Sequence, residues 1–179
     1  MRNIFVGALV WVVAGGMGLP AQTKSGEVEY IQREAPVVGG APGMKVKQLS
    51  SSPYRTFYVT LARGDEVTSG MTEFAEKYHI RTASVTAVGA FSSAILGWTD
   101  LQRKPPAMRK IPINEEVEVS MNGNITPGRD GKPAFHGHVF CALSDGSVKG
   151  GHMYEAKVGI IMQLTVTELE PSAETKTAE

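Results

Sequence analysis

Cysteine is nearly absent from this chain, and neither sign of charge is in excess. Its 179 residues include one cysteine, Cys141, so no disulfide can form within the chain and a disulfide-built scaffold is excluded. Lysine plus arginine number 18, as do aspartate plus glutamate, so the whole chain exerts no net attraction on nucleic acid or on an anionic membrane. Hydrophobic residues make up 42% of the sequence, enough for one globular domain with an ordinary core.

The apolar run at residues 4–14 is too short to span a bilayer, for which about 20 residues are needed. It follows Arg2 and leads into small residues that end at Ala21. This pattern is typical of a secretory signal peptide over residues 1–21, and it predicts a periplasmic or secreted protein. An uncleaved anchor is the alternative, and no cysteine follows the run to support a lipoprotein. Cleavage leaves 17 basic and 18 acidic residues, a net charge of −1.

Composition divides the remainder into three parts. Residues 22–43 are polar and then rich in proline and glycine, which predicts a flexible linker. Residues 44–169 carry the alternation and the helical spacing of a folded domain. Residues 170–179 are polar and charged, so we expect a disordered tail.

Apolar side chains near the start of the domain predict a strand followed by a helix. Phe57, Val59 and Leu61 alternate with other residues and therefore share one face of a strand. Asp65 is placed to cap a helix, whose apolar positions form one stripe at helical spacing. These positions are Val67, Met71, Phe74, Ala75 and Tyr78.

The rest of the domain reads as strands joined by short turns. Two β-rich segments, 83–91 and 94–99, meet near a pair of serines, and the last strand at 158–169 is apolar enough to be covered on both faces. Counting elements gives an α+β domain with about seven mostly antiparallel strands and one main helix packed on the sheet.

Three of the four histidines lie in one short stretch, His136, His138 and His152. An Asp-Gly turn at 145–146 interrupts the apolar pattern between them, which predicts a β-hairpin. His136 and His138 share a face because they are two residues apart on a strand. A two-residue turn would place His152 opposite Val139, on the wrong side of the sheet.

One extra residue in the hairpin restores the register. We expect a three-residue turn with a bulge at the glycine pair 150–151, which puts His152 opposite Phe140 and diagonal to His138. The three imidazoles then converge, and three neutral nitrogens on a rigid sheet suit Zn²⁺ with a fourth position open to water or a small-molecule ligand. A solvated or hydrogen-bonded histidine pair is the alternative.

Other reactive side chains carry weaker signals. Cys141 has the opposite parity from the histidines, which favours a small buried residue over a ligand. His79, at the end of the helix, is expected to interact with the helix carbonyls. Glu118 and Glu155 are the carboxylates that could serve as an acid/base partner. A basic loop at 100–112 carries no interleaved aromatic residue, which favours a solvated face over phosphate binding.

Several motifs resemble the PPC (plants and prokaryotes conserved) domain family. They are His-Gly-His at 136–138 and Ser-Asp-Gly-Ser-Val-Lys-Gly-Gly-His at 144–152, preceded by the segments 123–125 and 130–133. The segments 63–67 and 88–90 also fall in the family's order, and the resemblance covers roughly residues 50–169. Gln163 departs from the family's pattern, in which a glutamate often stands in the last strand.

The resemblance implies a PPC-like fold and a homotrimer, and the spacing of the three histidines leads us to expect a metal-binding protein. A Zn²⁺-dependent hydrolase or hydratase acting on a small molecule is the first alternative, because an open zinc position makes hydroxide available near neutral pH. DNA binding is the second, but the Arg-Gly-Arg-Pro type of hook used by plant members is absent and nucleic acid is an unexpected partner.

Overall fold

The computed structural model describes residue 30 and the ranges 39–50 and 54–169. The predicted signal peptide at 1–21, most of the linker and the tail at 170–179 lie outside the described residues. Within the described ranges, no helix is both long enough and apolar enough to cross a membrane.

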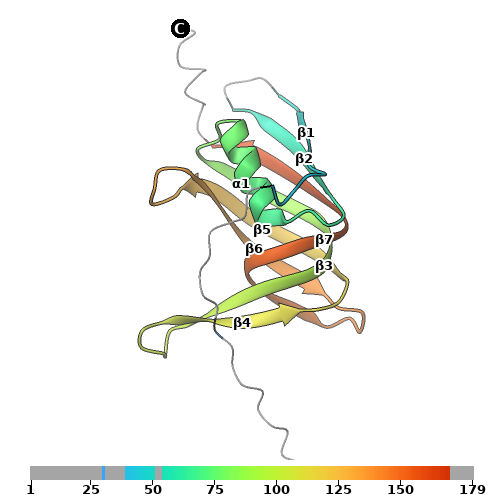
Figure 1. The fold of residues 1–179 in the computed structure, drawn as a ribbon, viewed down its shortest axis with the longest axis vertical. Helices are drawn as coiled ribbons and strands as arrows, with labels where there is room; N and C mark the ends of the chain where they lie inside the picture. The colour runs from blue at the N-terminus through green and yellow to red at the C-terminus, as the bar shows by residue number, and fades with distance from the viewer. Residues whose placement is uncertain (1–29, 31–38, 51–53, 170–179) are drawn as a thin grey trace, which may run out of the picture.

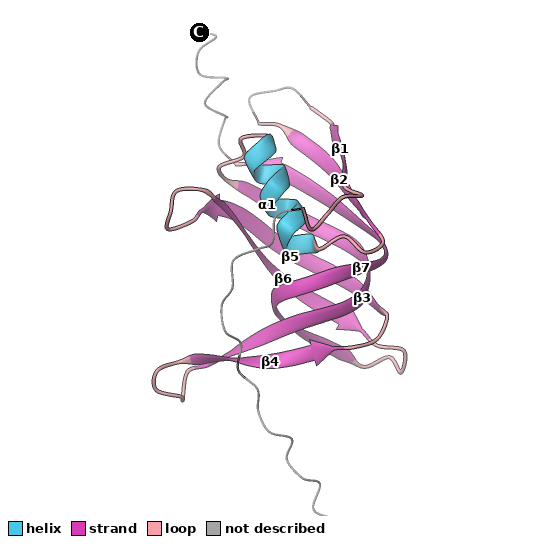
Figure 2. Cartoon of the chain, in the orientation of Figure 1, coloured by secondary structure: helices cyan, strands magenta, loops and turns pink. Residues whose placement is uncertain are grey.

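One antiparallel sheet and one helix make up the domain (Figures 1 and 2). The strand order is β1-β2-β7-β6-β5-β3-β4, and β7 pairs with β3 as well. The expectation of about seven antiparallel strands with one helix is confirmed. The elements are β1 (Lys45–Gln48), β2 (Thr56–Ala62), α1 (Val67–Lys77), β3 (Ala83–Asp100), β4 (Ala107–Ile113), β5 (Val117–Pro127), β6 (Pro133–Ala142) and β7 (Val148–Glu168).

The two longest strands roll the sheet onto itself. β3 pairs with β5 along its first half, with β4 along its second half and with β7 along both. Since β5 also pairs with β6 and β6 with β7, the ladder β3-β5-β6-β7 closes on β3. The segments 83–91 and 94–99, expected as two strands, are one strand that bends at register shifts between Gly89 and Ser93. A bulge redirects a strand without ending it, and that is the reason for the difference.

The core lies between α1 and the concave side of the sheet. Phe57, Val59 and Leu61 are fully buried, as their alternation predicts, and the expected helical stripe faces them. The rings of Phe57 and Phe74 meet edge to face with centroids 5.2 Å apart, and Tyr78 packs against both. Burial of this apolar surface, at about 25 cal/mol per Å², is the main contribution to the stability of the domain.

The helix begins one residue later than the sequence predicts. Glu66, and not Asp65, is the N-cap: its carboxylate accepts hydrogen bonds from the backbone N–H groups of Thr68 at 3.1 Å and Ser69 at 2.6 Å. Asp65 is buried and accepts from the N–H groups of Gly43 and Ala62, both at 2.8 Å. Gly64, with φ of 88°, forms a turn that leaves Asp65 in the loop before the helix. The next residue, Glu66, therefore caps the helix.

The last strand is covered on one face only within the chain. Met162 and Leu164 are fully buried, whereas Ile160 is 64% exposed and Ile161 39% exposed. The expectation of a strand covered on both faces is therefore wrong for the single chain, because no second layer packs on the convex side among the described residues. The convex side of the sheet also carries the histidines described next.

Candidate metal centre

A tight hairpin joins β6 to β7 and sets the register of the histidines. The backbone N–H of Leu143 donates to Ser147 O at 2.8 Å, and that of Gly146 donates to Leu143 O at 2.9 Å. Gly146 has φ of 81°, a conformation that glycine accepts without strain. Side-chain and backbone hydrogen bonds from Ser147, with the charge of Lys149, lower the pKa of Asp145. The turn therefore has three residues between Leu143 and Ser147.

This turn places His152 directly opposite His138. The predicted partner Phe140 instead faces Gly150, and the pairing from Ala142 to His138 runs without a bulge. The prediction of a bulge at the glycine pair is wrong because the strands meet one residue earlier, at Leu143 and Ser147, than the sequence pattern suggested. The parity is the same, and so the imidazoles still share one face.

The glycine pair serves close packing instead. A Cβ atom at Gly150 would lie 2.9 Å from the Phe140 ring, and one at Gly151 would lie 2.7 Å from the carbonyl oxygen of Gly97. Gly150 thus leaves room for an aromatic side chain, and Gly151 lets β3 approach β7 beside the histidines.

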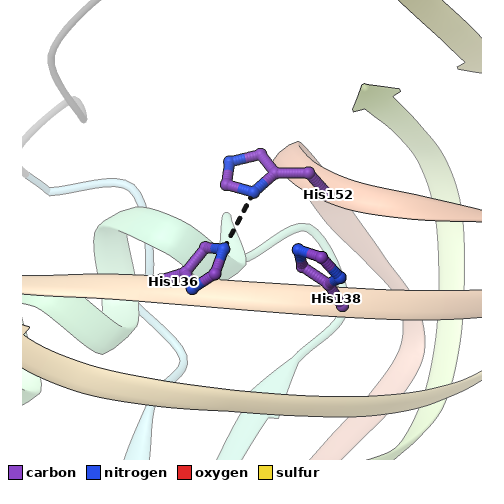
Figure 3. Close-up of side chains that lie close together, drawn as sticks. All are labelled: His136, His138 and His152. Atoms are coloured by element: carbon purple, nitrogen blue, oxygen red, sulfur yellow. Dashed lines mark hydrogen bonds between the residues drawn. The ribbon is translucent and has the colours of Figure 1, made fainter. Parts of the chain in front are cut away.

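The three imidazoles converge on the convex face of the sheet (Figure 3). One ligand nitrogen from each ring can be chosen so that all three lie within 4.8 Å of one another. His136 Nε2 lies 3.0 Å from His152 Nδ1, close enough for a hydrogen bond in which one ring donates. Ring centroids are 5.0 Å apart for His136 and His138 and 5.6 Å apart for His138 and His152. We call these three residues the histidine cluster.

The neighbouring strands add polar and aromatic groups that the sequence patterns did not single out. Asn122 on β5 lies opposite His138, and Asn124 lies opposite His136, so both amides border the cluster on the same face. The Tyr154 ring meets the His152 ring edge to face, with centroids 5.5 Å apart. Only the pairing of β5 with β6 shows that these residues border the histidines.

No carboxylate among the described residues joins the cluster. Glu118 pairs with Ala142, which is four residues after His138 on the same face of β6. Glu118 lines a separate pocket of about 340 Å³. Glu155 is exposed on β7 and pairs with Ile95 of β3. Gln163 pairs with Val88, so β3 and β5 separate it from β6. The structure therefore does not bring the candidate acid/base residues to the histidines.

The remaining cysteine and histidine lie apart from the cluster. Cys141 is fully buried on the concave side, as predicted, and burial raises the pKa of its thiol to about 11. His79 contacts the end of α1 through its backbone N–H, which donates to Glu76 O at 3.2 Å. His79 also lines a pocket at the end of the helix, and among the described residues its imidazole forms no hydrogen bond with a helix carbonyl.

Solved structures with this fold include proteins from archaea and bacteria. A metal-containing protein from Archaeoglobus fulgidus is 34% identical, with a TM-score of 0.59 over 66% of this chain and 81% of that one. A plant- and prokaryote-conserved (PPC) protein from Pyrococcus horikoshii is 25% identical, with a TM-score of 0.61 over 72% and 84%. A candidate DNA-binding protein from Ralstonia eutropha is 27% identical, with a TM-score of 0.58 over 65% and 78%. No curated protein matches the chain.

The model of the Plants and Prokaryotes Conserved (PCC) domain matches residues 48–170, which is more than half of the chain. These residues include strands β2 to β7, the helix and the whole histidine cluster, and they leave out most of β1. The chain therefore belongs to the PCC domain family, the one also written PPC.

Proposed function

We propose that the protein binds a divalent transition-metal ion, Zn²⁺ by preference, through the histidine cluster. The observation that carries this proposal is the convergence of three imidazole nitrogens to within 4.8 Å on adjacent, hydrogen-bonded strands. Tetrahedral Zn²⁺ with bonds of about 2.0–2.1 Å needs nitrogens about 3.3 Å apart, so small ring rotations suffice. The metal-containing relative from A. fulgidus supports the assignment.

The donor set also favours zinc over the harder cations. Three neutral imidazoles with no carboxylate suit Zn²⁺, Cu²⁺ or Ni²⁺, whereas Ca²⁺ and Mg²⁺ prefer oxygen ligands. Two of the three rings are exposed, so a fourth position faces solvent and is open to water or a small-molecule ligand. Bound zinc acts as a Lewis acid and lowers the pKa of its water, which is the chemistry a hydrolase would use.

Metal content of the purified protein tests the assignment. We expect about one zinc per chain by elemental analysis, and a sharp loss in each of His136→Ala, His138→Ala and His152→Ala. His79→Ala is the matched control, because it removes the fourth histidine outside the cluster and should leave the metal content unchanged. Wild-type zinc content in all three cluster variants would exclude these residues as ligands.

We further propose a homotrimer that covers the exposed apolar side chains of the convex face. Phe140 is 62% exposed, Val148 59% and Ile160 64%, and such apolar surface commonly marks a subunit contact. Sedimentation of the metal-loaded protein should give three times the chain mass, and Ile160→Asp should lower that mass. A monomer at micromolar concentration would exclude the trimer.

Export is proposed from residues 1–21 alone. The short apolar run after Arg2 supports removal of this segment after Ala21. Mass spectrometry of the protein from fractionated cells should find a chain that begins at Gln22 in the periplasm or the medium. A full-length chain in the cytoplasm would contradict this proposal.

DNA binding is the second candidate function, because the relative from R. eutropha is a candidate DNA-binding protein. The hairpin between β3 and β4 supplies exposed cations, among them Arg103 and Lys104. Retention of duplex DNA at physiological salt, weakening steeply as salt rises, would support this function. We rank it below metal binding, since the chain as a whole carries no net positive charge.

A further inference from the structure

A pocket of about 620 Å³ lies at the C-terminal end of α1 and is also lined by Lys132 and Pro133, where the loop between β5 and β6 ends. Its apolar lining residues are Pro133, which is half-buried, and Ala75 and Ile80, which are fully buried behind it. Its volume falls in the range of small-molecule sites, which are commonly apolar with a few polar groups at defined places. We call it the helix-end pocket, and it shares no residue with the histidine cluster.

The end of the helix places two ionisable side chains at this pocket. His79 has φ of 52°, the one positive value among the described residues other than glycine. This conformation reverses the chain, so that the N–H of Ile80 donates to Ala75 O at 2.9 Å and Ile80 becomes fully buried. His79 and Arg81 then stay exposed on either side of it, and both line the pocket.

The opposite wall is fixed by the loop at 128–132. The N–H of Gly128 donates to Lys132 O at 2.7 Å, and the N–H of Lys132 donates to the Asp130 carboxylate at 3.1 Å. These bonds hold the backbone of Lys132, whose ammonium forms no ion pair with any residue that the structure describes. Arg81 likewise has no hydrogen bond or ion pair among the described residues. Two cations without an ion pair among the described residues, and one imidazole, thus line the pocket around Pro133.

One acidic side chain, that of Glu76, lines the same pocket. Arg81 and Lys132 outnumber it, so the pocket has a positive balance in a chain whose overall charge is zero. A ligand that complements these walls needs a carboxylate for Arg81 and Lys132 and an aliphatic or aromatic portion for the apolar lining.

We propose that the helix-end pocket binds small organic carboxylates with an apolar tail. The cations give orientation, since a guanidinium can bind a carboxylate through two parallel hydrogen bonds. Pro133, together with the carbon stems of Arg81 and Lys132, gives apolar contact area beside the buried Ala75 and Ile80. The pocket is separate from the metal proposal and does not depend on it.

Octanoate is a suitable probe, titrated into the full chain and followed by amide chemical shifts. The matched compounds are octylamine, which reverses the charge, and octanol, which removes it. We expect saturable shifts with octanoate at residues 75–81 and 132–133, and much smaller ones with the other two. Absence of saturation by about 10 mM octanoate, or equal binding of octylamine, would overturn the proposal.

Substitutions test the charges in both directions. Arg81→Ala and Lys132→Ala should each weaken octanoate binding by about three- to ten-fold, and Glu76→Gln should tighten it. Arg63→Ala is the control: it removes an exposed arginine whose ion pair with Glu116 lies outside the pocket, so affinity should not change. Equal affinity in all four variants would contradict the assignment.

A carboxylate could also occupy the open position of a metal at the histidine cluster. The His138→Ala variant separates the two sites, because it removes a proposed zinc ligand and leaves the helix-end pocket intact. Octanoate binding that persists in this variant supports the helix-end pocket. Loss of binding would assign the carboxylate to the metal and overturn the proposal.

Discussion

His138 and His152 face each other across the antiparallel pair β6 and β7, as directly opposed residues of one register. Opposed residues have Cβ atoms about 4.5–5.5 Å apart, a separation that two imidazoles can bridge to a shared ion. His136, two residues before His138, completes the cluster from the same strand. The arrangement thus depends on the turn that fixes the register.

The turn itself can be perturbed without touching a histidine. Gly146 has φ of 81°, so Gly146→Val should strain the hairpin, lower the free energy of unfolding by about 1–2 kcal/mol and reduce zinc retention. Gly146→Asn is the matched control, since asparagine tolerates this conformation. Chemical denaturation and elemental analysis of both variants measure the effect. Equal zinc affinity in the valine variant would show that the turn does not govern the cluster.

Acid should release the metal before it unfolds the protein. Protons compete with zinc for imidazole nitrogens, so zinc retention should fall as the pH drops from about 8 to about 5. Hydrogen bonds from Ser147 lower the pKa of Asp145 below its usual value. The Asp145 carboxylate therefore stabilises the turn until the pH falls through this lowered pKa, which lies below the range of the experiment. The turn therefore persists across this range. Dialysis at stepped pH, with circular dichroism as the control, measures both; zinc fully retained at pH 5 would contradict the imidazole ligands.

The single thiol should be inert in the folded protein. Burial raises the pKa of Cys141 to about 11, so at pH 8 only about one thiol in a thousand is ionised. We expect no labelling of the native protein by a thiol reagent over an hour and complete labelling in denaturant. Ser144→Cys, in the exposed turn, is a positive control that should label at once in the native protein. Rapid labelling of Cys141 itself would show that β6 opens far more readily than its burial indicates.

Glu66 should matter more to stability than its place in a loop indicates. Its carboxylate accepts from Ser69 N at the start of α1 and from Ala156 N on β7 at 3.1 Å, so one side chain joins the helix to the sheet. Glu66→Ala should lower the free energy of unfolding by about 1–3 kcal/mol. Glu76→Ala, at an exposed position of the same helix, is the control and should change it by less than about 0.5 kcal/mol. Urea denaturation of both variants measures this free energy. An equal decrease in the two variants would contradict the role of Glu66.

Local patterns in the sequence predicted the element types and the convergence of the histidines, but they could not fix the long-range pairings. Alternation at Phe57, Val59 and Leu61 identifies a half-buried strand because side-chain direction is a local property. The exact partner of His152 depends on where the turn closes, and a shift of two residues preserves the parity. The prediction of the shared face therefore held while the predicted bulge did not.

The residues around the histidine cluster were harder to predict from the sequence. Asn122 and Asn124 border the histidines only because β5 pairs with β6 in one register, and the alternation of β5 alone gives no partner. The cap at Glu66 was missed for a similar reason: Asp65 and Glu66 are both suitable acids, and the turn at Gly64 decides between them.

Anomalous scattering at the zinc edge, measured on crystals of the metal-loaded protein, tests the central claim most directly. We predict one strong peak per chain on the convex face of the sheet, about 2.0–2.1 Å from one nitrogen each of His136, His138 and His152. A crystal that contains zinc but has no peak at these nitrogens would contradict the proposed metal centre.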